Sequence, residues 1–375
     1  MNNEISPFSP LPWTSGERPY HLIAGPCSAE SEAQTMRIAQ ALKEQGVGIY
    51  RASLWKPRTK PGGFEGVGLE GLSWLVRVQN EFGMQAMTEV ATPAHIEVAL
   101  RAGLKGIWIG ARTTASPFAM AEIAEALKGV DDVVVLVKNP ISPDINLWEG
   151  SLLRLKQAGV KHVGAIHRGF TTYGEQFYRN SPLWQIPIEL KLRHPELTVL
   201  VDPSHIGGKR SLIEGISRSA IEMHFDGLMV EVHDQPDMAL SDAEQQITPE
   251  HFKSIAESLA SMCTDNIDSP ELSQYRNTIN HIDEEILRLL VQRGEIAKAI
   301  GQYKHNRGMC ILQPERYREL MSSREQQAQT LGLDTKYVHD LFSIIHEESV
   351  RSQQALLNNA LTRHEDEWSA YISRK

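Results

Sequence analysis

The sequence predicts an α/β protein, a (β/α)8 TIM barrel, followed by an all-α domain of three helices. Short apolar runs alternate with amphipathic helical segments over roughly the first 260 residues. The alternation stops at a polar segment, after which apolar residues recur only at helical spacing. The chain of 375 residues is also longer than the size at which one hydrophobic core stops growing, which favours two domains.

Eight candidate strands predict the barrel. Several are continuous apolar runs, such as VVVLVK and TVLVD, which are typical of parallel strands covered on both faces. The predicted strands are residues 21–26, 48–52, 85–90, 106–110, 133–139, 162–169, 198–202 and 227–233. A doubly wound open sheet fits the alternation as well, but eight units in roughly 240 residues favour a closed barrel.

The C-terminal part is predicted to be helical throughout. Pro270 follows a serine and is typical of a first helical position, and no further proline occurs before Pro314. We therefore expect one helix of about 35 residues, followed by helices near 314–330 and 334–360. The predicted domain boundaries are a barrel over 1–262, a linker over 263–270 and a helical domain over 271–365.

The composition narrows the class of partner. The formal net charge of -9 argues against a nucleic-acid surface or an anionic membrane as the main partner. No apolar stretch is long enough to cross a bilayer. Cys27, Cys263 and Cys310 show no disulfide spacing, which is typical of a reducing compartment. We expect a cytoplasmic protein that binds neither nucleic acid nor membrane.

Metal-binding residue types gather where the predicted strands end, which is where barrel enzymes place their active sites. The candidate ligands are Cys27, His205, Glu231 and Asp242. A thiolate, an imidazole and two carboxylates suit Mn, Fe, Co or Zn better than Mg or Ca. Taken alone, Cys27 is more often a small buried apolar residue and His205 a helix-start or surface residue. Their joint position at strand ends favours a metal centre.

A set of cations follows the same strand ends. Its members are Lys56, Arg58, Arg112, Lys138 and Arg168. Guanidinium groups bind phosphate and carboxylate in a bidentate manner, and lysine adds a point charge. Each could be a solvated loop charge, but five at successive strand ends predict a substrate with several phosphate or carboxylate groups.

The first long helix carries Arg276, Arg293 and Lys304. Arg293 and Lys304 are eleven residues apart, which places them about 20° apart in phase and about 16 Å apart along the axis. Both could therefore reach one small dianion. Arg276 lies about 42 Å from Lys304 along the axis, so it could serve the same kind of site only in a second chain. The alternative is a solvated helix face.

The barrel region, residues 20–260, resembles the DAHP (3-deoxy-D-arabino-heptulosonate 7-phosphate) synthases. The motifs that carry the resemblance are Ala24-Gly25-Pro26-Cys27-Ser28, Lys56-Pro57-Arg58-Thr59, Gly110-Ala111-Arg112, Val137-Lys138, His167-Arg168-Gly169 and Asp202-Pro203-Ser204-His205. The similar subfamily is the shorter type I group, which includes the KDO8P (3-deoxy-D-manno-octulosonate 8-phosphate) synthases. The Lys-Pro-Arg-Thr form favours DAHP synthase, and KDO8P synthase is the alternative.

This resemblance implies condensation of phosphoenolpyruvate with erythrose 4-phosphate. It implies a divalent metal ion, Mn²⁺ first, with Fe²⁺, Co²⁺ or Zn²⁺ as alternatives, held by Cys27, His205, Glu231 and Asp242. Lys56 would be catalytic, as a proton donor to the developing alkoxide. The substrate-binding residues would be Arg112, Lys138 and Arg168 for phosphoenolpyruvate, and Arg58 and Thr59 for the phosphate of erythrose 4-phosphate.

Residues 272–354 resemble the all-helical chorismate mutases, interlocked homodimers with three helices per chain. The matching segments are YRNTINHIDEEILRLLVQRGEIAKAIGQYK, Pro314-Glu315-Arg316, and Ser349 with Gln353. The resemblance implies conversion of chorismate to prephenate, with Arg293, Lys304 and Gln353 as catalytic residues. It implies that Arg316 and Ser349 bind substrate, together with Arg276 of the other subunit.

Two positions depart from the mutase pattern and bear on its efficiency. Tyr317 stands where a glutamate commonly helps to hold the substrate hydroxyl, and Gln313 replaces a frequent aspartate. A helical domain that only dimerises and senses a ligand is therefore the alternative to a second enzyme. Only about 20 residues precede the first predicted strand, so we expect the helical domain to mediate any feedback inhibition by prephenate.

Overall fold

The structure is a computed structural model that describes residues 8–13, 19–56, 62–174, 177–260, 262 and 270–372. In the last range it describes the side chains of 272–355. The chain divides into two compact units, Met1–Thr264 and Asp265–Lys375. Within the described residues no helix is long and apolar enough to span a membrane. Most of the predicted linker, 263–269, lies outside the described residues.

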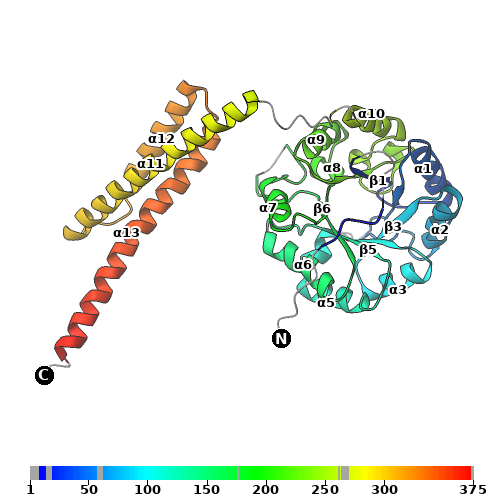
Figure 1. Cartoon of the computed structure of the whole chain (residues 1–375), viewed down its shortest axis with the longest axis horizontal. Coiled ribbons are helices and arrows are strands. Elements are labelled where there is room, and N and C mark those ends of the chain that lie inside the picture. Colours follow the sequence, from blue (N-terminus) through cyan, green and yellow to red (C-terminus); the bar gives the residue numbers. More distant parts are fainter. Residues whose placement is uncertain are drawn as a thin grey trace. The chain divides into compact units, whose positions relative to one another are not determined.

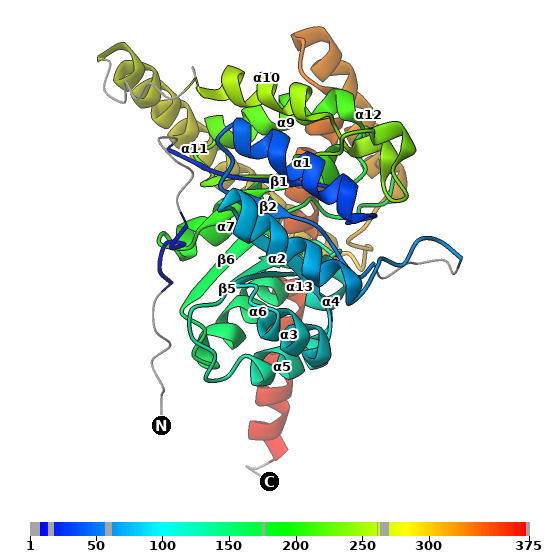
Figure 2. The ribbon, with the colours of Figure 1, turned by 90° about the vertical axis from the view of Figure 1, so that its right-hand side faces the viewer.

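The first unit is a closed barrel of eight parallel strands ringed by helices (Figures 1 and 2). The strands are β1 (His21–Gly25), β2 (Ile49–Arg51), β3 (Gln85–Val90), β4 (Gly106–Ile109), β5 (Val134–Lys138), β6 (His162–His167), β7 (Val199–Val201) and β8 (Gly227–Glu231). β1 pairs along its whole length with β8. This pairing closes the sheet, so the predicted barrel is confirmed and the open-sheet alternative is excluded.

Helices cover the outside of the barrel (Figure 1). They are α1 (Glu32–Glu44), α2 (Glu70–Phe82), α3 (Pro93–Arg101), α4 (Ala111–Thr114), α5 (Pro117–Ala126), α6 (Ile145–Gln157), α7 (Gln185–Arg193), α8 (Pro203–Gly207), α9 (Arg210–Glu222) and α10 (Pro249–Ala260). Side-chain N-caps begin several of them, because a serine, threonine or aspartate oxygen accepts an otherwise unpaired backbone N–H. Asp202 caps α8 in this way and so fixes the turn that carries His205.

The barrel contains two layers of apolar side chains. One lies between strands and helices, and the other fills the interior of the barrel with residues such as Trp108, Leu136 and Met229. Leu11 and Trp13, from the segment before β1, pack with the interior layer. Trp13 lies against Gly106, the first residue of β4. This segment therefore covers the N-terminal end of the barrel and leaves the opposite end for chemistry.

The second unit consists of α11 (Pro270–Asn306), α12 (Pro314–Leu331) and α13 (Thr335–Ile372) (Figure 1). The three predicted helices are confirmed, and α13 extends beyond the expected end near residue 360. Both α11 and α12 pack against α13. Gly332 ends α12 in the left-handed conformation that glycine adopts without strain.

Candidate functional site

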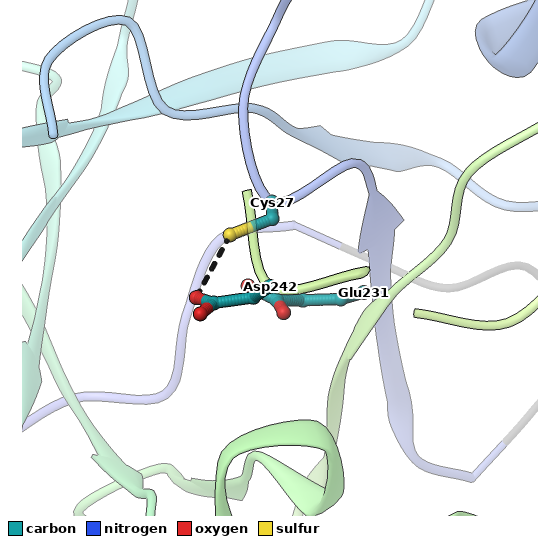
Figure 3. Close-up of side chains that lie close together, drawn as sticks. All are labelled: Cys27, Glu231 and Asp242. Carbon is teal, nitrogen blue, oxygen red and sulfur yellow. Dashed lines mark hydrogen bonds between the residues drawn. The ribbon is translucent and has the colours of Figure 1, made fainter. Parts of the chain in front are cut away.

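Three predicted metal ligands converge at the C-terminal end of the barrel (Figure 3). Cys27 follows β1, Glu231 is the last residue of β8, and Asp242 lies in the loop after β8. One ligand atom of each lies within 4.8 Å of the other two. Cys27 and Asp242 are 215 positions apart in sequence and meet because β1 pairs with β8.

The thiol of Cys27 is fully buried between a cation and an anion. Lys56 Nζ donates to Sγ at 2.8 Å, and Sγ donates to Asp242 Oδ2 at 3.3 Å. Burial, with the charge of Glu231, raises the pKa of the Cys27 thiol to about 12. Burial alone would lower the pKa of Lys56, but Cys27 and Glu231 outweigh it and raise that pKa. Lys56 therefore holds its proton beside the three ligands.

The two carboxylate oxygens of Glu231 have different surroundings. Its Oε2 accepts a 2.6 Å hydrogen bond from Gln245 Nε2. Its Oε1 is buried and, within the described part of the chain, accepts no hydrogen bond, although Arg51 Nη2 lies 3.2 Å away. Buried oxygens normally have partners. An Oε1 that accepts no hydrogen bond from a described residue, beside a thiol and a second carboxylate, fits a divalent cation.

His205 faces the same cluster but lies outside the set of three mutually close ligands. Its Nδ1 lies 2.8 Å from Asp202 Oδ2, and its Nε2 lies 3.8 Å from Glu231 Oε1. A carboxylate on one ring nitrogen orients the other nitrogen, as in many metal-binding histidines. Asp202 also pairs with Lys138 Nζ at 2.8 Å, so one buried carboxylate positions both a candidate ligand and a cation.

The structure places most of the predicted cations near this end. Lys138 is the last residue of β5, Arg168 follows β6, and Arg112 lies in α4 directly after β4. Burial lowers the pKa of Arg168 to about 10, and the charges of Arg179 and Arg112 add to the effect. Such mutual repulsion indicates a site that an anion would relieve. Arg58 and Thr59 lie outside the described residues.

In the helical unit, four predicted residues lie on the facing sides of α11 and α13. Arg293 Nη1 donates to Ser349 Oγ at 2.5 Å and to the Ile345 carbonyl at 3.2 Å. Lys304 Nζ donates to the Ile311 carbonyl at 2.5 Å. Gln353 is buried against Gly301 of α11, where a Cβ would lie 2.7 Å from its Cγ. The close approach of the two helices therefore depends on a glycine.

Two predicted substrate-binding residues stand apart from these four. Arg316 is exposed and pairs with Glu319 at 3.2 Å. Arg276 is exposed in the N-terminal part of α11. Neither side chain joins the α11–α13 group within one chain.

Two known protein families match the two units of the chain. Residues 13–266 match the DAHP synthetase I family. The chain belongs to this family. Residues 275–354 match chorismate mutase type II. The two domains of a bifunctional enzyme of aromatic biosynthesis are thus present in one chain.

Individual relatives agree with the family. The chain is 34% identical over 241 residues to a phospho-2-dehydro-3-deoxyheptonate aldolase of Thermotoga maritima, a match covering 64% of this chain and 69% of the relative. A crystal structure of DAHP synthase from that organism superimposes with a TM-score of 0.59 at 30% identity, covering 65% of this chain and 68% of the other. A 2-dehydro-3-deoxyphosphooctonate aldolase of Geotalea uraniireducens is 28% identical, covering 65% of this chain and 92% of that protein.

The sequence did not single out Arg51 as a functional residue of this DAHP synthase domain. It is the last residue of β2, is 1% exposed, and stacks over Trp108 at 4.9 Å. Its Nη2 donates to the Cys27 carbonyl at 3.3 Å, whereas Nε and Nη1 have no hydrogen-bond partner in the described chain. A buried guanidinium with two nitrogens that have no described partner, beside the candidate metal ligands, is a further anion-binding candidate. The one available signal was an arginine that ends a buried strand.

Proposed function

We propose that this chain condenses phosphoenolpyruvate with erythrose 4-phosphate in the barrel and rearranges chorismate to prephenate in the helical unit. The observation that supports the first activity is the cluster of Cys27, Glu231 and Asp242 directly beside Lys56. Family membership and the heptonate relative favour the four-carbon sugar phosphate over arabinose 5-phosphate. Cys27 and Cys310 are free thiols in the part of the chain that the structure describes, which further favours a cytoplasmic location.

A divalent ion, Mn²⁺ first, would be held by Cys27, Glu231 and Asp242, with Nε2 of His205 completing the set. When bound, it would supply Lewis-acid polarisation of the sugar aldehyde. The donor set fits such an ion because it combines one soft thiolate with harder oxygen and nitrogen donors. Fe²⁺, Co²⁺ and Zn²⁺ suit the same donors.

The cations of the barrel would bind the substrates and supply the proton. Lys138, Arg168 and Arg112 would bind phosphoenolpyruvate and offset its charge, so that two anionic substrates can approach. Lys56 keeps its proton in the free site and would give it to the developing alkoxide. Arg58 and Thr59 remain predicted ligands of the sugar phosphate.

In the helical unit, Arg293, Arg316 and Ser349 would bind the two carboxylates, and Lys304 and Gln353 would contact the ether oxygen. Catalysis would consist of selecting the compact conformer and stabilising charge on that oxygen, without a covalent step. Arg276 of the partner subunit would complete each site.

A homodimer through the helical unit is supported by its uncovered apolar face. Ile279 and Ala297 of α11 are eighteen residues apart, which is five full turns, so they lie on the same face. Ala297 is 7% exposed, whereas Ile279 is 57% exposed. The N-terminal half of this face therefore continues a buried face without a cover, as expected where a second copy packs.

The test is phosphoenolpyruvate consumption by metal-supplemented protein with each sugar phosphate, alongside a chorismate mutase assay. We expect turnover with erythrose 4-phosphate and little with arabinose 5-phosphate. Arg293→Ala should lower mutase kcat about a hundredfold, while the exposed Arg288→Ala on the same helix serves as the matched control. Turnover only with arabinose 5-phosphate would mean that the barrel is a KDO8P synthase and not a DAHP synthase.

The helical unit also fits a feedback sensor. We expect prephenate to lower synthase activity in the full chain and Arg293→Ala to remove this inhibition. Inhibition without any mutase turnover would make the unit a dimerisation and sensing module.

A further inference from the structure

A fifth side chain lies on the face of α13 that carries the mutase residues. Ser349 is three positions after His346 and Gln353 is seven positions after it. At about 100° per residue, seven positions fall about 20° short of two turns, and span about 10.5 Å. His346, Ser349 and Gln353 therefore form one row along the helix.

The contacts of neighbouring residues place the imidazole at the mutase site. Arg293 Nη1 reaches both the Ile345 carbonyl and Ser349 Oγ, on either side of His346 in the chain. The ring of Tyr317 in α12 lies 4.7 Å from the imidazole, tilted by 42°. Tyr317 is itself held by a 3.4 Å contact between its hydroxyl and Ser343 Oγ. The imidazole is thus fixed between α11 and α12.

Two atoms in this row lack partners. Nε2 of His346 and Oε1 of Gln353 are buried, and neither has a hydrogen bond with any described residue. Buried polar atoms are nearly always paired, so unpaired ones call for an explanation. Two of them in one row, flanking the Arg293–Ser349 contact, point to a ligand that supplies the missing bonds.

The charges around His346 determine whether its ring nitrogen Nε2 donates or accepts a hydrogen bond. Burial lowers the pKa of His346, and the positive charges of Arg293 and Lys304 lower it further. The imidazole is therefore neutral near pH 7, with one nitrogen that accepts a hydrogen bond. Neighbouring cations favour a lone pair over an N–H directed into the site.

We propose that His346 is a specificity-determining residue of the mutase site, and that its Nε2 accepts a hydrogen bond from the ring hydroxyl of the substrate. This inference rests on the proposed mutase function. Chorismate offers carboxylates and an ether oxygen, all acceptors, and its one hydroxyl is the donor that matches a neutral Nε2. His346 thereby supplies an acceptor for this hydroxyl next to Tyr317, the position where a glutamate is commonly found.

The test compares chorismate with its analogue lacking the ring hydroxyl, in the full-length protein. His346→Phe should lower kcat/KM for chorismate about tenfold, the usual size of one lost hydrogen bond, and change kcat/KM for the deoxy analogue less than twofold. His346→Gln, whose amide oxygen can accept the bond, should fall in between. His339→Phe, an exposed position on the same helix, should match the wild type.

The two substrates separate a contact from a structural role. Equal losses for both in His346→Phe, or no loss for either, would overturn the inference. If wild-type protein and Arg293→Ala both fail to turn over chorismate, the proposed mutase function itself is wrong. Circular dichroism of each variant confirms that the helices are retained.

Discussion

The two units solve the problem of burying apolar surface in opposite ways. In the barrel, large side chains such as Trp108 and Trp148 are completely buried within one chain. In the helical unit, Ile279, Ile282 and Ile286 are each about half exposed along one face. Exposed apolar faces of this length are typical of association surfaces. The barrel thus buries its core within one chain, whereas α11 leaves an apolar face exposed, as expected of the proposed dimer interface.

The units also differ in the partners of their buried and half-buried cations. The barrel buries its cations against its own carboxylates, as in Lys138–Asp202 and Arg51–Glu231. In the helical unit, the described contacts of Arg293 and Lys304 are to neutral oxygens. Buried charge must be paired, and in the barrel cluster Glu231 Oε1, which accepts no hydrogen bond from a described residue, favours a cation. Arg293 and Lys304, which have no carboxylate partner among the described residues, favour a dianion.

Removal of the metal ion should affect the activities of the two units most differently. Chelation should lower synthase activity at least about a thousandfold, because a Lewis acid contributes several kcal/mol to such a reaction. Mutase turnover should remain within about twofold, because its proposed residues need no metal. Parallel assays on one chelated sample, with Mn²⁺ added back, check both. Full synthase activity in protein shown by elemental analysis to be metal-free would break the comparison.

Mixing two inactive variants tests whether the helical unit is half of a site. Arg276→Ala and Arg293→Ala should each lower mutase kcat about a hundredfold, as for loss of one charge-stabilising donor. After subunit exchange, random pairing gives about half mixed dimers, each with one intact site, and therefore about a quarter of wild-type activity. Activity is measured before and after exchange. No recovery would place Arg276 outside the partner's site, whereas synthase activity serves as the internal control.

The barrel fold, and most of the candidate metal ligands at its C-terminal end, could be predicted from the sequence. Continuous apolar runs located the strands, and strand ends located Cys27 and Glu231, whereas Asp242 lies in the loop after β8. Arg51 could not be predicted as a site residue because β2 is only three residues long. So short a strand has no alternation that would show which way its side chain points. The relation of His205 to Asp202 also needed coordinates, since a spacing of three positions says nothing of ring orientation.

In the helical unit, periodicity found the helices but not what covers each face. His346 sits at a helical position that is equally typical of a core or a surface residue. Its proposed role depends on the burial of one ring nitrogen and on the charges of another helix, and both arise only from packing. Sequence spacing had similarly set Arg276 apart from Lys304, yet it could not distinguish a solvated face from an interface.

Shortening one apolar side chain of α11 should have the smallest effect of these changes. It tests directly whether the exposed apolar face of α11 forms the dimer interface. Ile282→Ala should weaken dimerisation about tenfold, because it removes apolar area from the proposed interface without touching a charged site residue. Val291→Ala, exposed on the other side of the same helix, is the matched control and should leave dimerisation unchanged. Sedimentation across a dilution series measures both dissociation constants. Equal constants for the two variants and the wild type would mean that another surface holds the copies together, and that the apolar face of α11 has a different cover.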